Sequence, residues 1–211
     1  DSQYKMRFKK ILLIKMSTDE DKKDFKKLAD SFHENKDYTS AIENYTKAID
    51  INTNDPLLYL YRGQSKFELK DYLGALSDYS KANELEPEDE YINESIGYVY
   101  SEMKDYKKAL YYYEQALKDH KESSVIHNNI GIVQNLLGNY NKSIHHRKLA
   151  VKLDPNSFSY LESLLFDLNY SPDMSAEEIF EYYEQLDKKF GLPDKDKWKS
   201  ITKPKIPNNK L

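Results

Sequence analysis

Polar side chains that could hold a peptide backbone gather on one face of a helix predicted near residue 130. The spacing i, i+1, i+4 and i+7 places four residues on that face: Asn128, Asn129, Ile132 and Asn135. An asparagine amide offers both a donor and an acceptor, so it can bond to an extended backbone whatever side chains that backbone carries. We expect these asparagines to contact a partner; the alternative is a solvated polar face.

Aromatic and acidic side chains take the same place on the two preceding predicted helices. One helix carries Leu60, Tyr61, Gln64 and Glu68, and the other carries Glu94, Ser95, Tyr98 and Glu102. Aromatic rings beside carboxylates suit a segment with apolar and basic side chains. The predicted partner is therefore a protein or peptide segment that carries basic residues. Tyr98 has an alternative role in packing between neighbouring helices.

The sequence contains no grouping of residues typical of catalysis or of a bound metal or cofactor. Its 211 residues include no cysteine, which excludes disulfides, zinc–thiolate sites and cysteine nucleophiles. His145 and His146 are adjacent, so they diverge by about 100° around a helix and are poorly placed to bind one metal. His33, His120 and His127 are scattered, with no nucleophile and carboxylate at a useful spacing. We expect no catalytic residue, no metal and no cofactor.

The helices that position these faces recur at a fixed period. Ala41, Ala75, Ala109 and Ser143 are separated by 75 − 41 = 34 residues. Further rows keep this spacing: Tyr38, Tyr72, Tyr106 and Tyr140; Tyr45, Tyr79, Tyr113 and Arg147; Ala48, Ala82, Ala116 and Ala150; and Ala29, Gly63, Gly97 and Gly131. Small residues let two antiparallel helices approach closely, and aromatic residues fill the spaces between their ridges.

These rows resemble the tetratricopeptide (TPR) repeat over about residues 22–157. The resemblance implies an all-α fold, a right-handed solenoid of four helix pairs followed by C-terminal capping helices. We expect repeats at 22–55, 56–89, 90–123 and 124–157, with helices at 17–35, 38–51, 56–69, 72–85, 90–103, 106–119, 124–137 and 140–153.

The same resemblance assigns a place to the candidate binding residues. In TPR proteins the first helix of each pair lines a concave groove in which partners bind. Asn129 falls in the register where transferase-type superhelices carry a ladder of asparagines. Lys27, Tyr61 and Ser95 occupy that register in the other pairs, so we expect one rung rather than a ladder.

Composition narrows the classes of partner. Charged residues make up 32% of the chain and the mean hydropathy is −0.86, which suits a solenoid because it has no deep centre. The net charge is −4, and acidic and basic residues are interleaved along the chain, which argues against a nucleic-acid partner. No apolar run approaches the roughly 18 residues of a membrane span, and residues 11–14 are too short for a secretory signal. We expect a cytoplasmic protein.

Both ends depart from the repeats. Residues 1–21 are predicted to be an N-terminal extension and the start of the first helix, with Met16 as an alternative natural start. The basic, proline-spaced residues 192–211 are predicted to be a linker. Residues 158–191 are predicted to be capping helices, the second beginning at a capping box of Ser175 and Glu178. Its apolar residues could form a homodimer interface: Ile179, Phe180, Tyr183 and Phe190.

This last region is similar to the junction between TPR arrays and the catalytic region of SPINDLY-like glycosyltransferases (family 41). The matching residues are Leu164-Leu165-Phe166, Leu168-Asn169-Tyr170, Pro172-Asp173, Ser175, Glu177-Glu178-Ile179-Phe180, Asp187, Phe190-Gly191-Leu192-Pro193 and Trp198. The resemblance implies a substrate-recruiting region whose catalytic lobes would follow Leu211; none of the family's catalytic residues is present. A stand-alone adaptor and a self-assembling scaffold are the alternatives.

Overall fold

Every regular element of the described chain is an α-helix. The computed structural model describes residues 20–87, 89–118, 122–171 and 174–191. A helix over residues 20–34 is followed by α2 (Tyr38–Ile51), α3 (Pro56–Glu68), α4 (Tyr72–Leu85), α5 (Glu90–Glu102), α6 (Tyr106–Ala116), α7 (Ser124–Leu136), α8 (Tyr140–Leu153), α9 (Phe158–Tyr170) and α10 (Ala176–Phe190). The predicted extension before residue 20 and the predicted linker lie outside the described residues.

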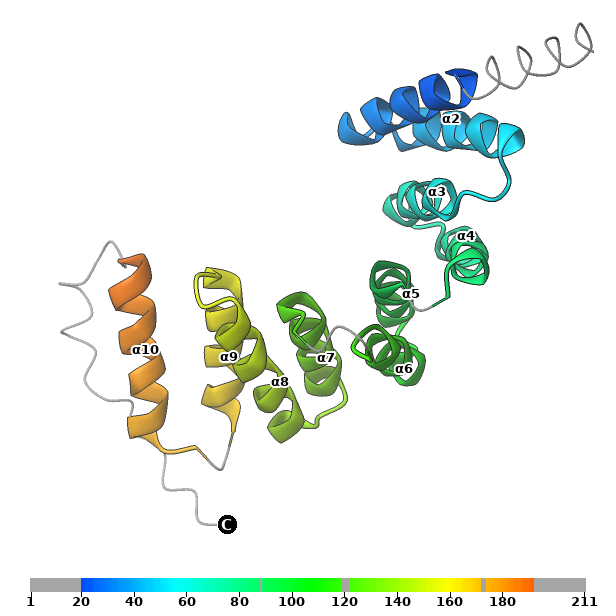
Figure 1. Cartoon of the computed structure of the whole chain (residues 1–211). Coiled ribbons are helices and arrows are strands. Elements are labelled where there is room, and N and C mark those ends of the chain that lie inside the picture. The colour runs from blue at the N-terminus through cyan, green and yellow to red at the C-terminus, as the bar shows by residue number, and fades with distance from the viewer. Residues whose placement is uncertain (1–19, 88, 119–121, 172–173, 192–211) are drawn as a thin grey trace, which may run out of the picture.

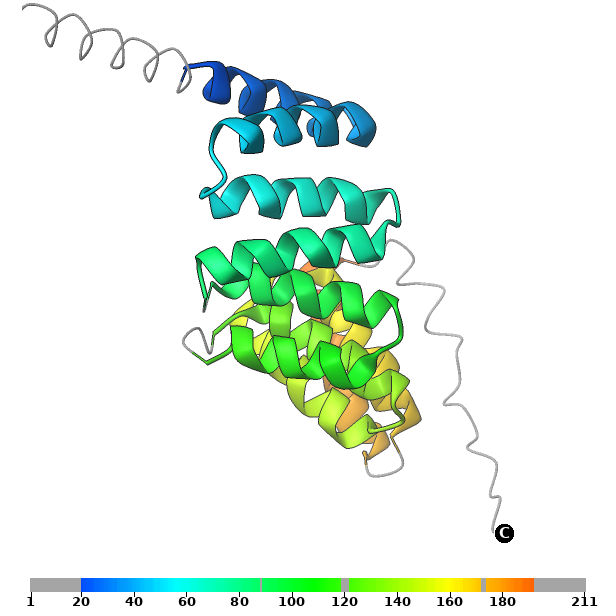
Figure 2. The same ribbon diagram turned by 90° about the vertical axis from the view of Figure 1, so that its right-hand side faces the viewer.

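The helices stack into a curved solenoid, as the repeats predict. Antiparallel pairs form an arc in which α3, α5 and α7 lie on the inner side and α4, α6 and α8 on the outer side (Figure 1). Seen from the side, the pairs up to α6 are successive layers (Figure 2). On the inner side α3 contacts α5, and α5 contacts α7. The all-α solenoid is therefore confirmed.

The row of small residues marks the closest approach within each pair. A Cβ atom added to Gly63 would lie 2.6 Å from the ring of Tyr79, and one added to Gly97 would lie 2.7 Å from the ring of Tyr113. Both rings are buried. The tyrosine row and the glycine row therefore require each other, which explains why both keep the same period.

The turn inside each pair has a fixed backbone geometry. Lys36, Lys70 and Lys104 share a φ of 62°, and Gly138 takes this place with a φ of 76°. The N–H of Lys70 donates to Phe67 and that of Asp71 donates to Lys66, which closes the end of α3 with two reverse bonds. The Asp71 side chain then accepts from the N–H of Gly74 and caps α4.

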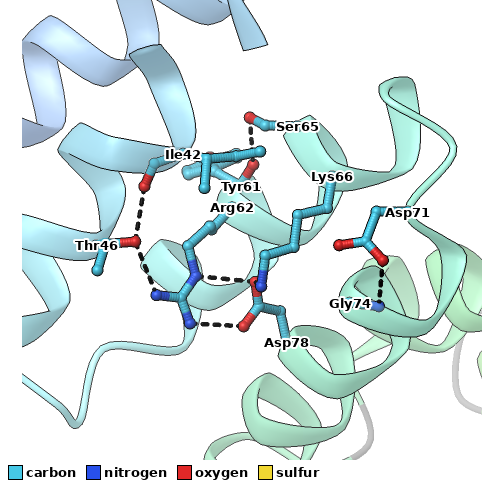
Figure 3. A network of polar contacts seen from close by, with 9 residues as sticks. All are labelled: Ile42, Thr46, Tyr61, Arg62, Ser65, Lys66, Asp71, Gly74 and Asp78. Carbon is cyan, nitrogen blue, oxygen red and sulfur yellow. Dashed lines mark hydrogen bonds and ion pairs between the residues drawn. The ribbon is translucent and has the colours of Figure 1, made fainter. Parts of the chain in front are cut away.

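A buried ion-pair network ties the first pairs together. Arg62 on α3 donates from Nε and Nη2 to the carboxylate of Asp78 on α4 at 2.9 and 2.7 Å. Its Nη1 donates to Thr46 on α2 at 3.0 Å, and Lys66 also lies 2.8 Å from Asp78 (Figure 3). Three nitrogen donors of two cationic side chains therefore surround one buried carboxylate, and hydrogen bonds of this kind offset the cost of its burial.

The fourth pair replaces aromatic packing by a second buried network. Arg147 stands in the tyrosine row, and its Nε lies 2.8 Å from Oδ2 of Asp167 on α9. Asp167 is fully buried. Ser143, which stands in the alanine row, donates to the same carboxylate, and Asn135 donates to it at 2.7 Å. The two departures from the repeat therefore have one cause, a carboxylate on the following helix.

The last helices continue the solenoid with looser pairing. Leu165 on α9 stands one period after Gly131 and packs with Leu186 on α10, so a large side chain replaces the small one at the crossing. The predicted capping box of Ser175 and Glu178 is confirmed. The predicted end of α6 at residue 119 is wrong: the helix ends at Ala116, and the N–H of Lys118 donates to the carbonyl of Gln115.

Candidate functional site

One side of each first helix is left exposed at equivalent repeat positions. The exposed residues recur at i, i+7 and i+11: Tyr91, Tyr98 and Glu102 on α5; Val125, Ile132 and Leu136 on α7; Ser159, Phe166 and Tyr170 on α9. On α3 the same positions hold Leu57, Gln64 and Glu68. We call these residues the inner face, because α3, α5 and α7 lie on the inner side of the arc (Figure 1).

Contacts between successive first helices hold this face together. The rings of Phe67 on α3 and Tyr98 on α5 lie 5.2 Å apart. Asn129 on α7 donates to Glu94 on α5 at 3.4 Å. The bond from Asn135 to Asp167 joins α7 to α9. The exposed side chains are therefore presented in a fixed register.

Tyr61, which the sequence places among the binding residues, is half-buried between repeats. Its ring stacks on Tyr45 with centroids 6.1 Å apart, and Nζ of Lys26 lies 4.8 Å from the ring centroid. Lys26 also pairs with Asp30 at 2.7 Å, and Asp30 accepts from the hydroxyl of Tyr45. Tyr61 thus closes a polar–aromatic cluster that links the helix over residues 20–34 to α3. Gln64 is half-buried and Glu68 is exposed beside it.

The acidic residues around Tyr98 form the electrostatic centre of the face. Partial burial raises the pKa of Glu94, and the charge of Glu90 adds to the effect. Burial also raises the pKa of Tyr98, followed by the charges of Glu102 and Glu68. Tyr98 is 46% exposed, so it both packs on Phe67 and offers a ring flanked by carboxylates. A cation placed here would relieve the repulsion among these groups.

The three asparagines of α7 have separate surroundings. Asn129 is bonded to Glu94, and Asn135 to Asp167. Asn128 is half-buried, and its Oδ1 has no hydrogen-bond partner among the described residues. Tyr61, which stands two periods before Asn129, packs on Tyr45. The single asparagine rung at Asn129 stays a prediction. Asn135 acts within the chain as a contact between repeats.

Of the residues predicted for a homodimer interface, three face α9 and one faces solvent. Ile179, Tyr183 and Phe190 pack on the apolar residues of α9. The ring of Phe190 meets that of Phe158 edge-on at 5.4 Å, and Asn169 donates to the hydroxyl of Tyr183 at 2.8 Å. Phe180 is 61% exposed.

The histidines form a pair that adjacency in sequence did not suggest. His146 on α8 approaches His127 on α7, with their Nδ1 atoms 3.0 Å apart, while His145 is exposed. Burial lowers the pKa of His146 to about 4, with His127 and His145 adding to the effect. No group of three or more metal-ligating side chains occurs within the described residues. At this distance one ring donates an N–H to the other, and the contact joins α7 to α8.

Seven inner-face residues were not among the predicted site residues: Leu57, Tyr91, Val125, Leu136, Ser159, Phe166 and Tyr170. Phe166 stands two periods after Tyr98, since 98 + 34 + 34 = 166, and Tyr170 stands one period after Leu136. Their rings lie 4.9 Å apart. Extending the 34-residue rows one helix further would have found Phe166 and Tyr170.

Comparison with known proteins identifies the repeats. A TPR repeat model matches residues 29–69, and a tetratricopeptide repeat model matches residues 92–118. Among solved structures, MamA 41-end from Desulfovibrio magneticus RS-1 is 20% identical, with 80% of this chain and 94% of that chain covered and a TM-score of 0.70. Pseudomonas aeruginosa PilF is 17% identical, with 83% and 79% covered and a TM-score of 0.73.

A third solved structure, YrrB, is described as a TPR protein with an unusual peptide-binding site. It is 16% identical, with 78% of this chain and 84% of that chain covered and a TM-score of 0.61. No curated protein sequence matches.

The fold and these matches define the class: the chain carries tetratricopeptide repeats stacked as a solenoid. The comparisons give no support to the resemblance of the region after the repeats to a glycosyltransferase junction. Part of that resemblance, Pro172-Asp173, Leu192-Pro193 and Trp198, lies outside the described residues. None of the described helices is both long and apolar enough to cross a bilayer.

Proposed function

We propose that this chain is a protein-interaction module that binds an extended segment of a partner along the inner face. The observation that carries the proposal is the periodic exposure of aromatic, aliphatic and acidic side chains on successive first helices. A monomer seldom leaves large apolar side chains uncovered along one continuous surface without a use for them. YrrB, a protein of the same fold, is described as having a peptide-binding site, which supports this class of function.

Basic residues in the bound segment would answer the charge of the face. The charges of Glu102 and Glu68 act on Tyr98, Glu94 stands one turn before it, and α5 contains no lysine or arginine. A partner with lysine or arginine should therefore associate faster and bind more tightly than an acidic one, and its affinity should fall as salt rises.

A double substitution tests the proposal. Tyr98→Ala with Asn129→Ala removes an exposed ring and the single asparagine rung. The double substitution should weaken the binding of a partner peptide by about tenfold or more. Tyr111→Ala on α6 is the matched control, because Tyr111 is a comparably exposed tyrosine on a second helix. Normal binding by the double variant, with loss of binding in the control, would move the site to the outer side.

A stand-alone adaptor fits the comparisons better than an enzyme fragment. The solved relatives named above are covered over most of their own length, at 94%, 79% and 84%. Recruitment of substrates for a glycosyltransferase stays a prediction. It requires two α/β nucleotide-sugar-binding lobes after Leu211, and a reading frame without them would end it.

A cytoplasmic location stays a prediction. Self-association through α10 is the remaining alternative and also stays a prediction. Most of its predicted residues pack on α9, which leaves Phe180 as the exposed ring. Light scattering of the full chain with and without Phe180→Ser tests it: only a dimer that dissociates in the variant would support this interface.

A further inference from the structure

The inner face changes chemical character along the solenoid. On α5 it is acidic, with Glu94 and Glu102 beside Tyr98. On α7 it is apolar: the 13 residues of Ser124–Leu136 contain no Asp, Glu, Lys or Arg, although 32% of the whole chain is charged. Ile132 and Leu136 stand exposed there.

The apolar part continues onto α9 with aromatic residues. Phe166 is 56% exposed and Tyr170 is 65% exposed, and their rings lie 4.9 Å apart. α9 carries two charged residues. Asp167 is buried against Arg147, and Glu162 is exposed one turn before Phe166. The bond between Asn135 and Asp167 fixes the alignment of the two helices, because Asn135 lies between Ile132 and Leu136, and Asp167 follows Phe166. The apolar surface is thus built by the fold rather than left by chance.

We propose that the inner face is bipartite and takes a segment of another protein with basic residues at one end and aliphatic or aromatic residues at the other. This inference rests on the proposed function, and it adds the order and spacing of the partner's residues. Lysine or arginine lies against α5 and α3, and apolar side chains lie against α7 and α9. Charge complementarity selects this occupant, since the acidic end would repel an acidic segment and α7, which has no charged residue, would leave a second cation unpaired.

The spacing of the partner follows from geometry. Neighbouring helices in such packing lie about 8–10 Å apart, and an extended chain advances about 3.3 Å per residue. One repeat therefore corresponds to about three residues of the partner. In the partner, the basic residues should therefore lie about three positions from the apolar residue that contacts α7. They should lie about six positions from the apolar residue that contacts α9.

The experiment uses the full chain and synthetic peptides of about twelve residues. The probe carries two lysines, a Ser/Gly spacer of about three residues, and Leu and Phe separated by a similar spacer; a second probe has the reverse order. An all-basic and an all-apolar peptide of the same length are the comparisons. We expect one orientation of the mixed peptide to bind about tenfold or more tightly than either comparison.

Two pairs of substitutions on the inner helices separate the two ends of the face. Phe166→Ser with Tyr170→Ser should abolish the preference for apolar residues and leave the salt dependence intact. Glu94→Gln with Glu102→Gln should abolish the salt dependence and leave the apolar preference intact. Leu73→Ser on the outer helix α4, at a leucine that is 72% exposed, is the control and should change neither. Circular dichroism of each variant establishes that it is folded.

The outcomes distinguish this inference from the proposed function. Equal binding of mixed and all-basic peptides, lost in the variant with Tyr98→Ala and Asn129→Ala, would overturn the bipartite face and keep the binding module. Dimerisation abolished by Phe166→Ser with Tyr170→Ser would assign the apolar end to a second copy and overturn it. Binding that appears only after Trp198→Ser and Ile201→Ser would likewise assign the face to the chain's own residues 192–211.

Discussion

At the scale of single residues, Glu94 shows how a residue proposed to bind a partner can reduce stability. Its carboxylate is partly buried with Asn129 as a donor, and its pKa is raised above the ordinary value by desolvation. A raised carboxyl pKa means that the folded state holds its proton more tightly than the unfolded state does. Ionisation therefore weakens folding, and the penalty is present at neutral pH and vanishes as the pH falls toward 4.5, the ordinary value.

Glu94→Gln should consequently raise the melting temperature at pH 7, because it removes the charge and keeps an acceptor for Asn129. The gain over the native chain should shrink through the interval between the raised pKa and 4.5 and be absent below it. Thermal unfolding of both proteins across this range measures the difference. A gain that is the same at pH 4 and pH 7 would show that the carboxylate is not strained.

Lys70 illustrates a backbone cost that can be relieved. Its φ of 62° is a left-handed conformation that disfavours side chains, and Gly138 occupies this place in the fourth pair. Lys70→Gly should stabilise the chain by up to about 1 kcal/mol. Gly138→Lys is the reciprocal change and should destabilise it. Urea unfolding of both variants is the measurement, and a loss of stability in Lys70→Gly would mean that the lysine side chain contributes more than the turn costs.

At the scale of elements, the buried carboxylate of Asp167 holds α9 on α7 and α8. Asp167→Ala would leave Arg147 buried without its counter-charge, which costs about 3–5 kcal/mol. Hydrogen exchange should then speed up in α9 and α10 first. Glu162→Ala, at an exposed carboxylate of the same helix, is the control and should unfold like the native chain.

A triple variant separates the network from the position. Ser143→Ala and Arg147→Tyr restore the residues of the other repeats, and Asp167→Leu removes the charge they would otherwise leave unpaired. If the network only replaces aromatic packing, this variant should regain most of the stability that Asp167→Ala loses. A triple variant as unstable as the single one would show that the polar contacts specify the position of α9.

How far the sequence predicts these elements depends on whether the deciding contact lies inside the repeat. The glycine and tyrosine rows predict their helices correctly because each pair needs the same close crossing, as at Gly63 and Tyr79. Arg147 and Ser143 could be recognised only as departures, since their reason is Asp167 on the next helix. Phe166 and Tyr170 were interpreted as part of a junction motif, although they continue the periodic rows.

Which side chains meet across two helices could also not be predicted from the sequence. His127 and His146 are 19 residues apart and meet because α7 and α8 are antiparallel. In the sequence, only the adjacent pair, His145 and His146, stands out as possible metal ligands. The direction of the Tyr61 ring, toward Tyr45 and Lys26, depends on the preceding repeat in the same way. Repeats predict the position of a residue, and its neighbours decide its role.

At the scale of the whole molecule, stability should pass between neighbours. Ala75 is fully buried at the crossing of α3 and α4, so Ala75→Leu should overpack it and cost about 1–3 kcal/mol. Because each pair is stabilised largely by the next, exchange should rise in α2 and α5 as well. Ser77→Leu, an exposed site on α4, is the control. An unchanged melting temperature in Ala75→Leu would contradict the crossing described here.

The central claim, that partners bind along the first helices, is tested most directly by photo-crosslinking. The mixed basic–apolar peptide, carrying a benzophenone at its apolar end, is irradiated with the full chain and the modified residues are mapped by mass spectrometry. We expect crosslinks on α7 and α9 around Ile132, Leu136 and Phe166. The crosslinks should move to α5 when the benzophenone is placed at the basic end. Crosslinks concentrated on α4, α6 and α8 with either peptide would contradict it.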